Sequence, residues 1–137
     1  MVHDKVKADD SLSPLKVEYS PSPVSIINNG HTIQVNLHNQ DNKLTIEGKT
    51  YLLQQFHFHL PSEHEVDGKH AEMELHLVHK SEDGSLTTPP CTEGVQWTVL
   101  ENPVTWSGEQ IGKFAAIFPH DNRPVQPLGS REIGSDE

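Results

Sequence analysis

Hydrophobic and polar residues alternate along three stretches of this chain. In residues 31–39, HTIQVNLHN, the apolar side chains take every second position, and the same period recurs in residues 72–80, EMELHLVHK. Residues 51–60, YLLQQFHFHL, form a third stretch rich in leucine and aromatic residues. A period of two sends successive side chains to opposite faces of a strand. Each stretch is therefore predicted to be a β-strand with one apolar and one polar face.

One helix is predicted, near residues 108–118. Ser107 and Gln110 form a capping-box pattern, apolar residues follow at helical spacing, and Pro119 ends the segment. Residues 95–100, VQWTVL, predict a further strand. The predicted fold class is mainly β, with a largely antiparallel central sheet and one short helix.

The length of 137 residues fits a single domain spanning residues 1–137. Only 33% of the residues are hydrophobic, so the core is expected to be thin. Residues 1–20 are mostly polar and predict an irregular arm, and residues 130–137 predict a frayed tail.

The formal net charge of -10 argues against nucleic acid or an anionic membrane as a partner, because both would repel the chain. No apolar run is long enough to span a bilayer, and the polar start at residues 1–14 contains no secretory signal. Cys91 is the only cysteine, so it cannot form an internal disulfide.

Histidine is the compositional anomaly, with ten residues in the chain. His57 and His59 lie two apart in a predicted strand and share a face, and an antiparallel neighbour would bring His76 opposite them. Three imidazoles leave a fourth position open, as in a catalytic zinc site. Gln55 and Glu74 each lie two residues before a ligand, where they could fix its tautomer. A solvated polar face also explains His57 and His59 alone; His76, Glu74 and the apolar reverse face favour metal.

A family resemblance rests on three long motifs, QFHFHLPSEHEVDGKHAEMELHLVHK, GSLTTPPCTEGVQW and NRPVQPL. Together they resemble the alpha-class carbonic anhydrases, especially bacterial ones, over residues 12–131. The resemblance implies a reduced form of that family's central sheet, a Zn2+ cofactor, and reversible hydration of CO2 to bicarbonate by a zinc-bound hydroxide. It makes His57, His59 and His76 the zinc ligands and Gln55 and Glu74 their hydrogen-bond partners.

The resemblance also implies roles beyond the ligands. Glu63 would accept a hydrogen bond from Thr87, which orients the hydroxide, and His31 would be the proton shuttle. Without the resemblance, a histidine after a turn is more often simply exposed. The residues expected to line the substrate cleft are Gln34, Val78, Leu86, Thr88, Val95 and Trp97.

The other histidines fall into two groups. His64 and His79 match framework positions of the family. The rest are expected to be solvated: His3, His38, His70 and His120.

The chain departs from this family by being shorter. LVHKSEDG runs directly into SLTTPP, where the family has several more strands and a helical stretch. The loss predicts exposed sheet edges and a homodimer formed through them. It also predicts a turnover reduced more than the zinc affinity, because the cleft lacks one wall. In bacterial relatives the cysteine that matches Cys91 pairs with a second cysteine in an amino-terminal segment. This chain lacks that segment, so the resemblance implies that Cys91 is unpaired.

Function and location follow from the resemblance as expectations. The leading interpretation is a carbonic anhydrase, and the alternative is a zinc-binding β scaffold with little or no catalysis. A metalloprotease is disfavoured, because His64-Glu65 is not followed by a histidine at the helical spacing such enzymes need. The family implies a periplasmic or secreted protein, whereas the absence of a signal peptide is compatible with a recombinant soluble form.

Overall fold

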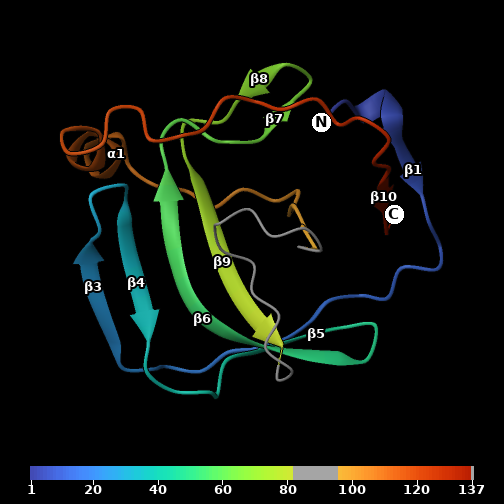
Figure 1. Cartoon of the computed structure of the whole chain (residues 1–137), viewed down its shortest axis with the longest axis horizontal. Coiled ribbons are helices and arrows are strands. Elements are labelled where there is room, and N and C mark those ends of the chain that lie inside the picture. Colours follow the sequence, from blue (N-terminus) through green and yellow to red (C-terminus); the bar gives the residue numbers. More distant parts are fainter. Residues whose placement is uncertain (82–95, 137) are drawn as a thin grey trace.

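The computed structural model describes residues 1–81 and 96–136 (Figure 1). As predicted, the architecture is mainly β, and the described residues contain a single α-helix. The elements run in the order η1 (His3–Lys5), β1 (Val6–Ala8), β2 (Lys16–Glu18), β3 (Val24–Asn28), β4 (Ile33–Leu37), β5 (Lys43–Ile46), β6 (Lys49–His59), β7 (Glu65–Val66), β8 (Lys69–His70), β9 (Glu74–Ser81), α1 (Gly108–Ala115) and β10 (Ile133–Ser135).

Six strands form one antiparallel sheet built around β6. The order is β2-β5-β6-β4-β3, and β9 also pairs with β6. The 11 residues of β6 allow β5 and β4 to share one of its edges while β9 occupies the other. In Figure 1, β6 and β9 curve together through the middle of the molecule, and the β3–β4 hairpin lies to one side. This sheet confirms the predicted antiparallel arrangement.

The strand register puts the predicted ligands next to one another. His57 of β6 is the direct partner of His76 on β9, and His59 is the partner of Glu74. On the other edge of β6, Gln34 of β4 lies opposite His57. Because partners on neighbouring strands share a face, the polar side chains of three strands gather on one side of the sheet.

A β-bulge in β6 sets which residues face this side. Leu53 is opposite His79, whereas Gln55 is opposite Val78, so the register shifts across Gln54. The extra residue changes the alternation by one position. Leu53 is therefore on the side of His79, while Gln55 joins the side of His57, His59 and His76.

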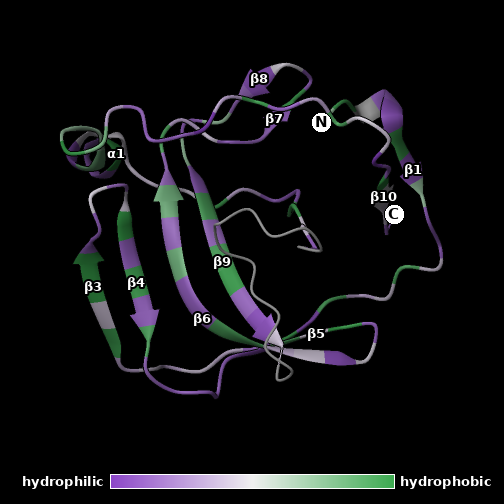
Figure 2. Cartoon of the chain, in the orientation of Figure 1, coloured by the Kyte–Doolittle hydropathy of each residue, from purple (hydrophilic) through white to green (hydrophobic). Residues whose placement is uncertain are grey.

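The reverse side of β6 packs under α1. The ring of Phe58 lies 6.2 Å from that of Phe114 and 5.0 Å from that of Trp106, measured between centroids. Among the described residues the buried hydrophobic side chains are Val35, Leu53, Val78 and Phe114. Figure 2 shows hydrophobic and hydrophilic bands alternating along β6 and β9. The core is thin, as the composition predicts.

The helix begins as predicted and ends early. Ser107 Oγ accepts the N–H of Gln110, and Gln110 Oε1 accepts the N–H of Ser107, which completes the capping box. The last helical residue is Ala115, rather than residue 118. No helix in the described part of the chain combines the length and apolar character needed to cross a membrane.

Both ends of the chain contain short paired strands. Within the segments expected to be an irregular arm and a frayed tail, β1 pairs in parallel with β10, and β2 pairs with β5. Pairing gives the backbone N–H and C=O groups of these short segments their hydrogen-bond partners. The residue pattern within one end of the chain cannot show that a distant segment will pair with it.

The predicted strand at residues 95–100 also differs from the structure. Residues 96–100 have no strand geometry, and residue 95 lies outside the described residues. The side chains of Trp97, Val99 and Leu100 are exposed. Strand propensity without a bonded neighbouring strand does not make a strand.

Candidate metal centre

Three imidazole rings converge on the polar side of β6 and β9. The ring centroids of His57 and His59 are 5.0 Å apart, those of His57 and His76 are 5.1 Å apart, and those of His59 and His76 are 4.6 Å apart. One nitrogen of each ring lies within 4.8 Å of one nitrogen of the other two. The structure thus brings together the three residues that the alternation singles out, in an arrangement that could hold a metal ion.

Side-chain oxygens engage the second nitrogen of two of these rings. Gln55 Oε1 lies 2.9 Å from His57 Nδ1, and Glu74 Oε1 lies 2.9 Å from His76 Nε2. Each bond turns that nitrogen into the N–H donor, which leaves the other nitrogen as a lone-pair donor. Nε2 of His57 and Nδ1 of His76 are thereby prepared for a metal.

The third ring is held by a residue that the sequence did not indicate. The backbone carbonyl of Asp121 lies 3.2 Å from His59 Nδ1, and Asp121 Oδ1 accepts the N–H of Leu60 at 2.7 Å. Three imidazoles with fixed tautomers are the donor set that a catalytic zinc prefers. The residues present therefore fit Zn2+.

Asp121 could not have been found from a motif. It lies 62 residues from His59 in a segment without periodicity, and its contact with the ring uses the backbone, which every residue has. Its side chain is 7% exposed, and Oδ2 has no hydrogen-bond partner among the described residues.

Charge and burial shift the pKa values of His57, Glu74 and His64 in different directions. Burial, with the neighbouring His76 and His59, lowers the pKa of His57 to about 4. Burial alone would raise the pKa of Glu74, but hydrogen bonds from His64 and His76 outweigh it and hold that pKa far below the usual range. The hydrogen bond to Glu74 raises the pKa of His64. At neutral pH the site therefore combines a neutral His57 with a charged Glu74.

A second group that could hold a metal shares one residue with the first: His64, Glu74 and His76. In this group, His64 Nδ1 at 2.6 Å and His76 Nε2 at 2.9 Å both contact Glu74 Oε1. Those nitrogens already use the carboxylate as their partner. Of the two groups, His57, His59 and His76 therefore have the freer nitrogens for a metal, and Glu74 holds the rings of His64 and His76.

Glu63 lies at the edge of the cluster. Its Oε1 accepts the N–H of Arg123 at 3.0 Å and lies 3.7 Å from His59 Nδ1, and its side chain is 14% exposed. Its expected partner, Thr87, lies outside the described residues, as do Leu86, Thr88 and Val95 of the expected cleft and Cys91, which was expected to be unpaired.

The other predicted cleft residues lie at varying depth around the cluster. Val78 is buried and lies two residues after His76, on the same face of β9. Gln34 is the cross-strand partner of His57. Trp97 is half exposed, with its ring 5.1 Å from that of His76. His31 is exposed in the turn before β4, and its ring makes no contact with the cluster within the described residues.

Two further histidines have defined partners. His79 Nε2 lies 2.6 Å from the hydroxyl oxygen of Tyr19. His70 is exposed, as predicted, and its ring also contacts the carbonyl of Ser62 through Nδ1 and a carboxylate oxygen of Glu65 through Nε2.

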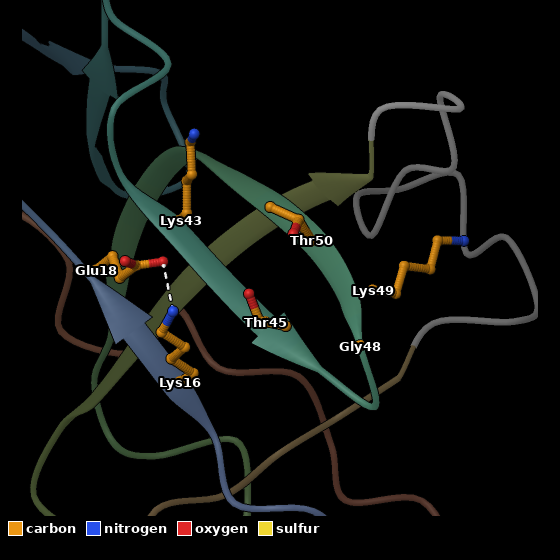
Figure 3. Close-up of a pocket in the computed structure, with 7 residues that line it drawn as sticks. All are labelled: Lys16, Glu18, Lys43, Thr45, Gly48, Lys49 and Thr50. Atoms are coloured by element: carbon orange, nitrogen blue, oxygen red, sulfur yellow. Dashed lines mark ion pairs between the residues drawn. The ribbon is translucent and has the colours of Figure 1, made fainter.

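A separate hollow of about 680 Å³ lies on the β2–β5 side of the sheet (Figure 3). It is open, and Lys16 within it pairs with Glu18 at 3.5 Å. Its lining consists of Lys16, Glu18, Lys43, Thr45, Gly48, Lys49 and Thr50, without a histidine. This hollow is separate from the cluster of His57, His59 and His76.

Comparison with known proteins gives one consistent group. A family model described as eukaryotic-type carbonic anhydrase matches residues 1–83 and 81–137. A carbonic anhydrase of Pectobacterium carotovorum is 37% identical over 177 residues, covering 88% of this chain and 72% of the relative. That alignment is longer than this chain of 137 residues, so the relative has internal segments missing here. The family model also breaks at residues 81–83, next to the point where the motifs place the loss.

Solved structures agree. The alpha-carbonic anhydrase from Thermovibrio ammonificans, in complex with the inhibitor sulfanilamide, gives a TM-score of 0.90 at 30% identity, covering 98% of this chain and 84% of that one. Dioscorin complexed with ascorbate gives a TM-score of 0.88 at 25% identity, covering 96% of this chain and 81% of that one.

Proposed function

Because the chain belongs to the alpha-class carbonic anhydrases, whose general reaction is the hydration of carbon dioxide, we propose that it catalyses this reaction with zinc held by His57, His59 and His76. The observation that carries the proposal is the set of three converging rings, each with its second nitrogen on an acceptor. A solvated histidine cluster would have no need of three separate acceptors.

The metal supplies acidity. When bound at such a site, zinc lowers the pKa of a coordinated water to about 7, a value known for carbonic anhydrases in general. The protein's part is to orient the rings and to fix their tautomers. Gln55, Glu74 and the Asp121 carbonyl do so through the bonds described above.

Glu63 is proposed to remain an acceptor beside the substrate. Its Oε1 is fixed by the N–H of Arg123. We assign its other partner to the hydroxyl of Thr87, so that the threonine oxygen presents a lone pair to the attacking water. This arrangement would orient the nucleophile toward the carbon of CO2.

The proton released in each turnover must leave the site. An imidazole that titrates near neutral pH suits this transfer. His31 is exposed in the turn that leads into β4, and Gln34 of that strand lies opposite His57. We assign His31 as the group that passes the proton to buffer.

The substrate is small and apolar, and the bicarbonate product is anionic. Val78 and Trp97 are proposed to form part of the wall against which CO2 rests, with Gln34 on the polar side. The half-exposed Trp97 leaves this wall open to water, which favours a turnover lower than that of the longer relatives.

The decisive experiment measures zinc stoichiometry and CO2 hydration on the same sample. We expect one zinc per chain and hydration above buffer background. His76→Ala should lose both, whereas His120→Ala, which changes an exposed histidine, should keep both. Thr87→Ala should keep zinc and lose most of the turnover. Zinc bound at another stoichiometry, or unaffected by His76→Ala, would contradict the proposed site.

The alternative function is a zinc-binding β scaffold without catalysis. The specific observation in its favour is the likeness to dioscorin, a protein solved with ascorbate and not named for this reaction. Stoichiometric zinc with hydration at background would select the scaffold. His76→Ala should lose zinc under either function. The hydration rate of the zinc-loaded parent therefore distinguishes the two.

A further inference from the structure

The outer strand β3 presents an apolar edge. It is one end of the sheet order, and its exposed hydrophobic side chains are Val24 at 48%, Ile26 at 68% and Ile27 at 41%. Figure 2 shows this strand largely in the hydrophobic colour at the margin of the molecule. Exposed edges of this kind pair readily with another chain.

The hairpin that carries this edge has no charge. Residues 19–40 contain no Asp, Glu, Lys or Arg, although the chain has 30 of them in 137 residues. The opposite end of the same sheet, β2, has Lys16 and Glu18 in a strand of three residues. Edge strands are commonly protected by charged side chains, so β2 is protected and β3 is not.

No strand of the described residues 1–81 and 96–136 pairs with the outer edge of β3, so its backbone presents an ordered set of hydrogen-bonding groups there. Pro23 O accepts the N–H of His38, and the N–H of Asn29 donates to Thr32 O, both at 3.2 Å. In an antiparallel ladder the bonded pairs alternate with non-bonded ones. The odd-numbered residues of β3 therefore bond to β4, and the N–H and C=O of Val24, Ile26 and Asn28 point outward.

We propose that two copies of this chain pair antiparallel through β3, about a two-fold axis at Ile26. In this register Ile26 faces its own copy, and Val24 faces Asn28 of the other copy. Each pair exchanges two backbone hydrogen bonds, and all the outward groups of the strand are used. The edge is thus self-complementary, as an isologous interface requires.

Electrostatics favours this edge over the charged parts of the surface as the place where two copies meet. Two chains of net charge -10 repel each other, and the cost is smallest where both surfaces lack charge. The pairing also sets Ile26 of each copy side by side on the sheet face that continues through its cross-strand partner Val35 and on to Phe56. The inference is independent of catalysis.

The test is sedimentation velocity of the zinc-loaded protein from low micromolar to millimolar concentration. We expect a monomer–dimer equilibrium that salt strengthens, because salt screens the repulsion between the two acidic chains. Ile26→Lys should raise the dimer Kd about a hundredfold, since two like charges meet on the axis. Val17→Lys on β2, at a position 53% exposed, is the matched control and should leave Kd unchanged.

Amide hydrogen exchange gives a second readout on the parent protein. The amides of Val24, Ile26 and Asn28 should become protected as concentration rises, while those of Ser25 and Ile27 stay protected at all concentrations. A monomer throughout the range would overturn the proposal. So would a dimer that Ile26→Lys leaves intact, or one that Val17→Lys weakens as much.

Discussion

Each of the three site histidines is held through its second nitrogen by a different chemical group. The acceptors are an amide oxygen for His57, a carboxylate for His76 and a backbone carbonyl for His59. Only the first two can be removed by substitution. The amide is the cleaner choice, because the carboxylate of Glu74 also holds His64.

Gln55→Leu is expected to weaken zinc binding about 10- to 100-fold, the usual loss when a metal-bound histidine loses its hydrogen-bond partner. The ring of His57 would keep its position but not its tautomer. Competition with a chromophoric chelator measures the affinity directly. Gln54→Leu, at the exposed neighbour on the bulge, is the control and should bind as the parent does. Equal affinities for both variants would refute the role of Gln55.

His57 and His64 should titrate on opposite sides of the ordinary histidine pKa of 6.5 in the zinc-free protein. Burial and the neighbouring histidines bring the pKa of His57 to about 4, whereas the hydrogen bond to Glu74 raises that of His64. Proton NMR of the ring C–H signals measures both values. His57 titrating near 6.5 would show that the ring is not buried as described.

The two shifts have opposite effects on folding. Between pH 6.5 and about 4 the unfolded chain binds a proton that the folded His57 refuses, so this residue lowers the free energy of unfolding as the pH falls through that window. The contribution of His64 has the other sign. It is fully present below pH 6.5 and is lost as the pH rises through its raised folded pKa.

For single residues, the sequence predicts which side chains share a face of a strand. It does not predict which distant residues contact them. Alternation placed His57, His59 and His76 together because the period of a strand is fixed. It could not indicate Asp121, whose carbonyl reaches His59 from a distant segment. A backbone acceptor leaves no trace in residue type.

Among the elements, the strands with an internal pattern were predictable and the pairings were not. β4, β6 and β9 match the alternating stretches, but the bulge at Gln54 is not visible in the letters. The pairing of β1 with β10 joins opposite ends of the chain. Residues 96–100 have strand composition without strand geometry. Pairing depends on a partner, and the partner is a property of the fold.

Gly112→Ala in α1 should stabilise the protein by about 0.5–1 kcal/mol, because glycine in a helix interior loses more backbone entropy on folding than alanine. An added Cβ at this position meets no atom within 4 Å. Urea unfolding, with the slope held constant, measures the change.

Gly48→Ala is the matched control for that substitution. It also meets nothing within 4 Å, but its φ is +76°, a conformation that costs an alanine about 1–2 kcal/mol. The two variants differ only in backbone conformation. They should move the unfolding midpoint in opposite directions, and a shift in the same direction would contradict the assigned turn.

For the whole molecule, the thin core sets how stability is distributed. The described residues bury four hydrophobic side chains, and none of their side chains is less than 2% exposed. The low hydrophobic content predicted this. It could not show that the two chain ends would pair, or that the uncharged residues 19–40 would form the outer hairpin.

Zinc is therefore expected to contribute a large share of the stability. A metal that binds only the folded chain adds about 2.7 kcal/mol when its free concentration is a hundred times Kd. For a chain of this size that corresponds to a rise in Tm of roughly 5–10 °C. Calorimetry with zinc and with chelator measures the difference. His76→Ala should unfold at one Tm in both conditions, because only two rings remain to hold the ion, while His120→Ala should respond to zinc as the parent does. A zinc-dependent shift of equal size in His76→Ala would mean that the stabilising ion binds outside the three-histidine site.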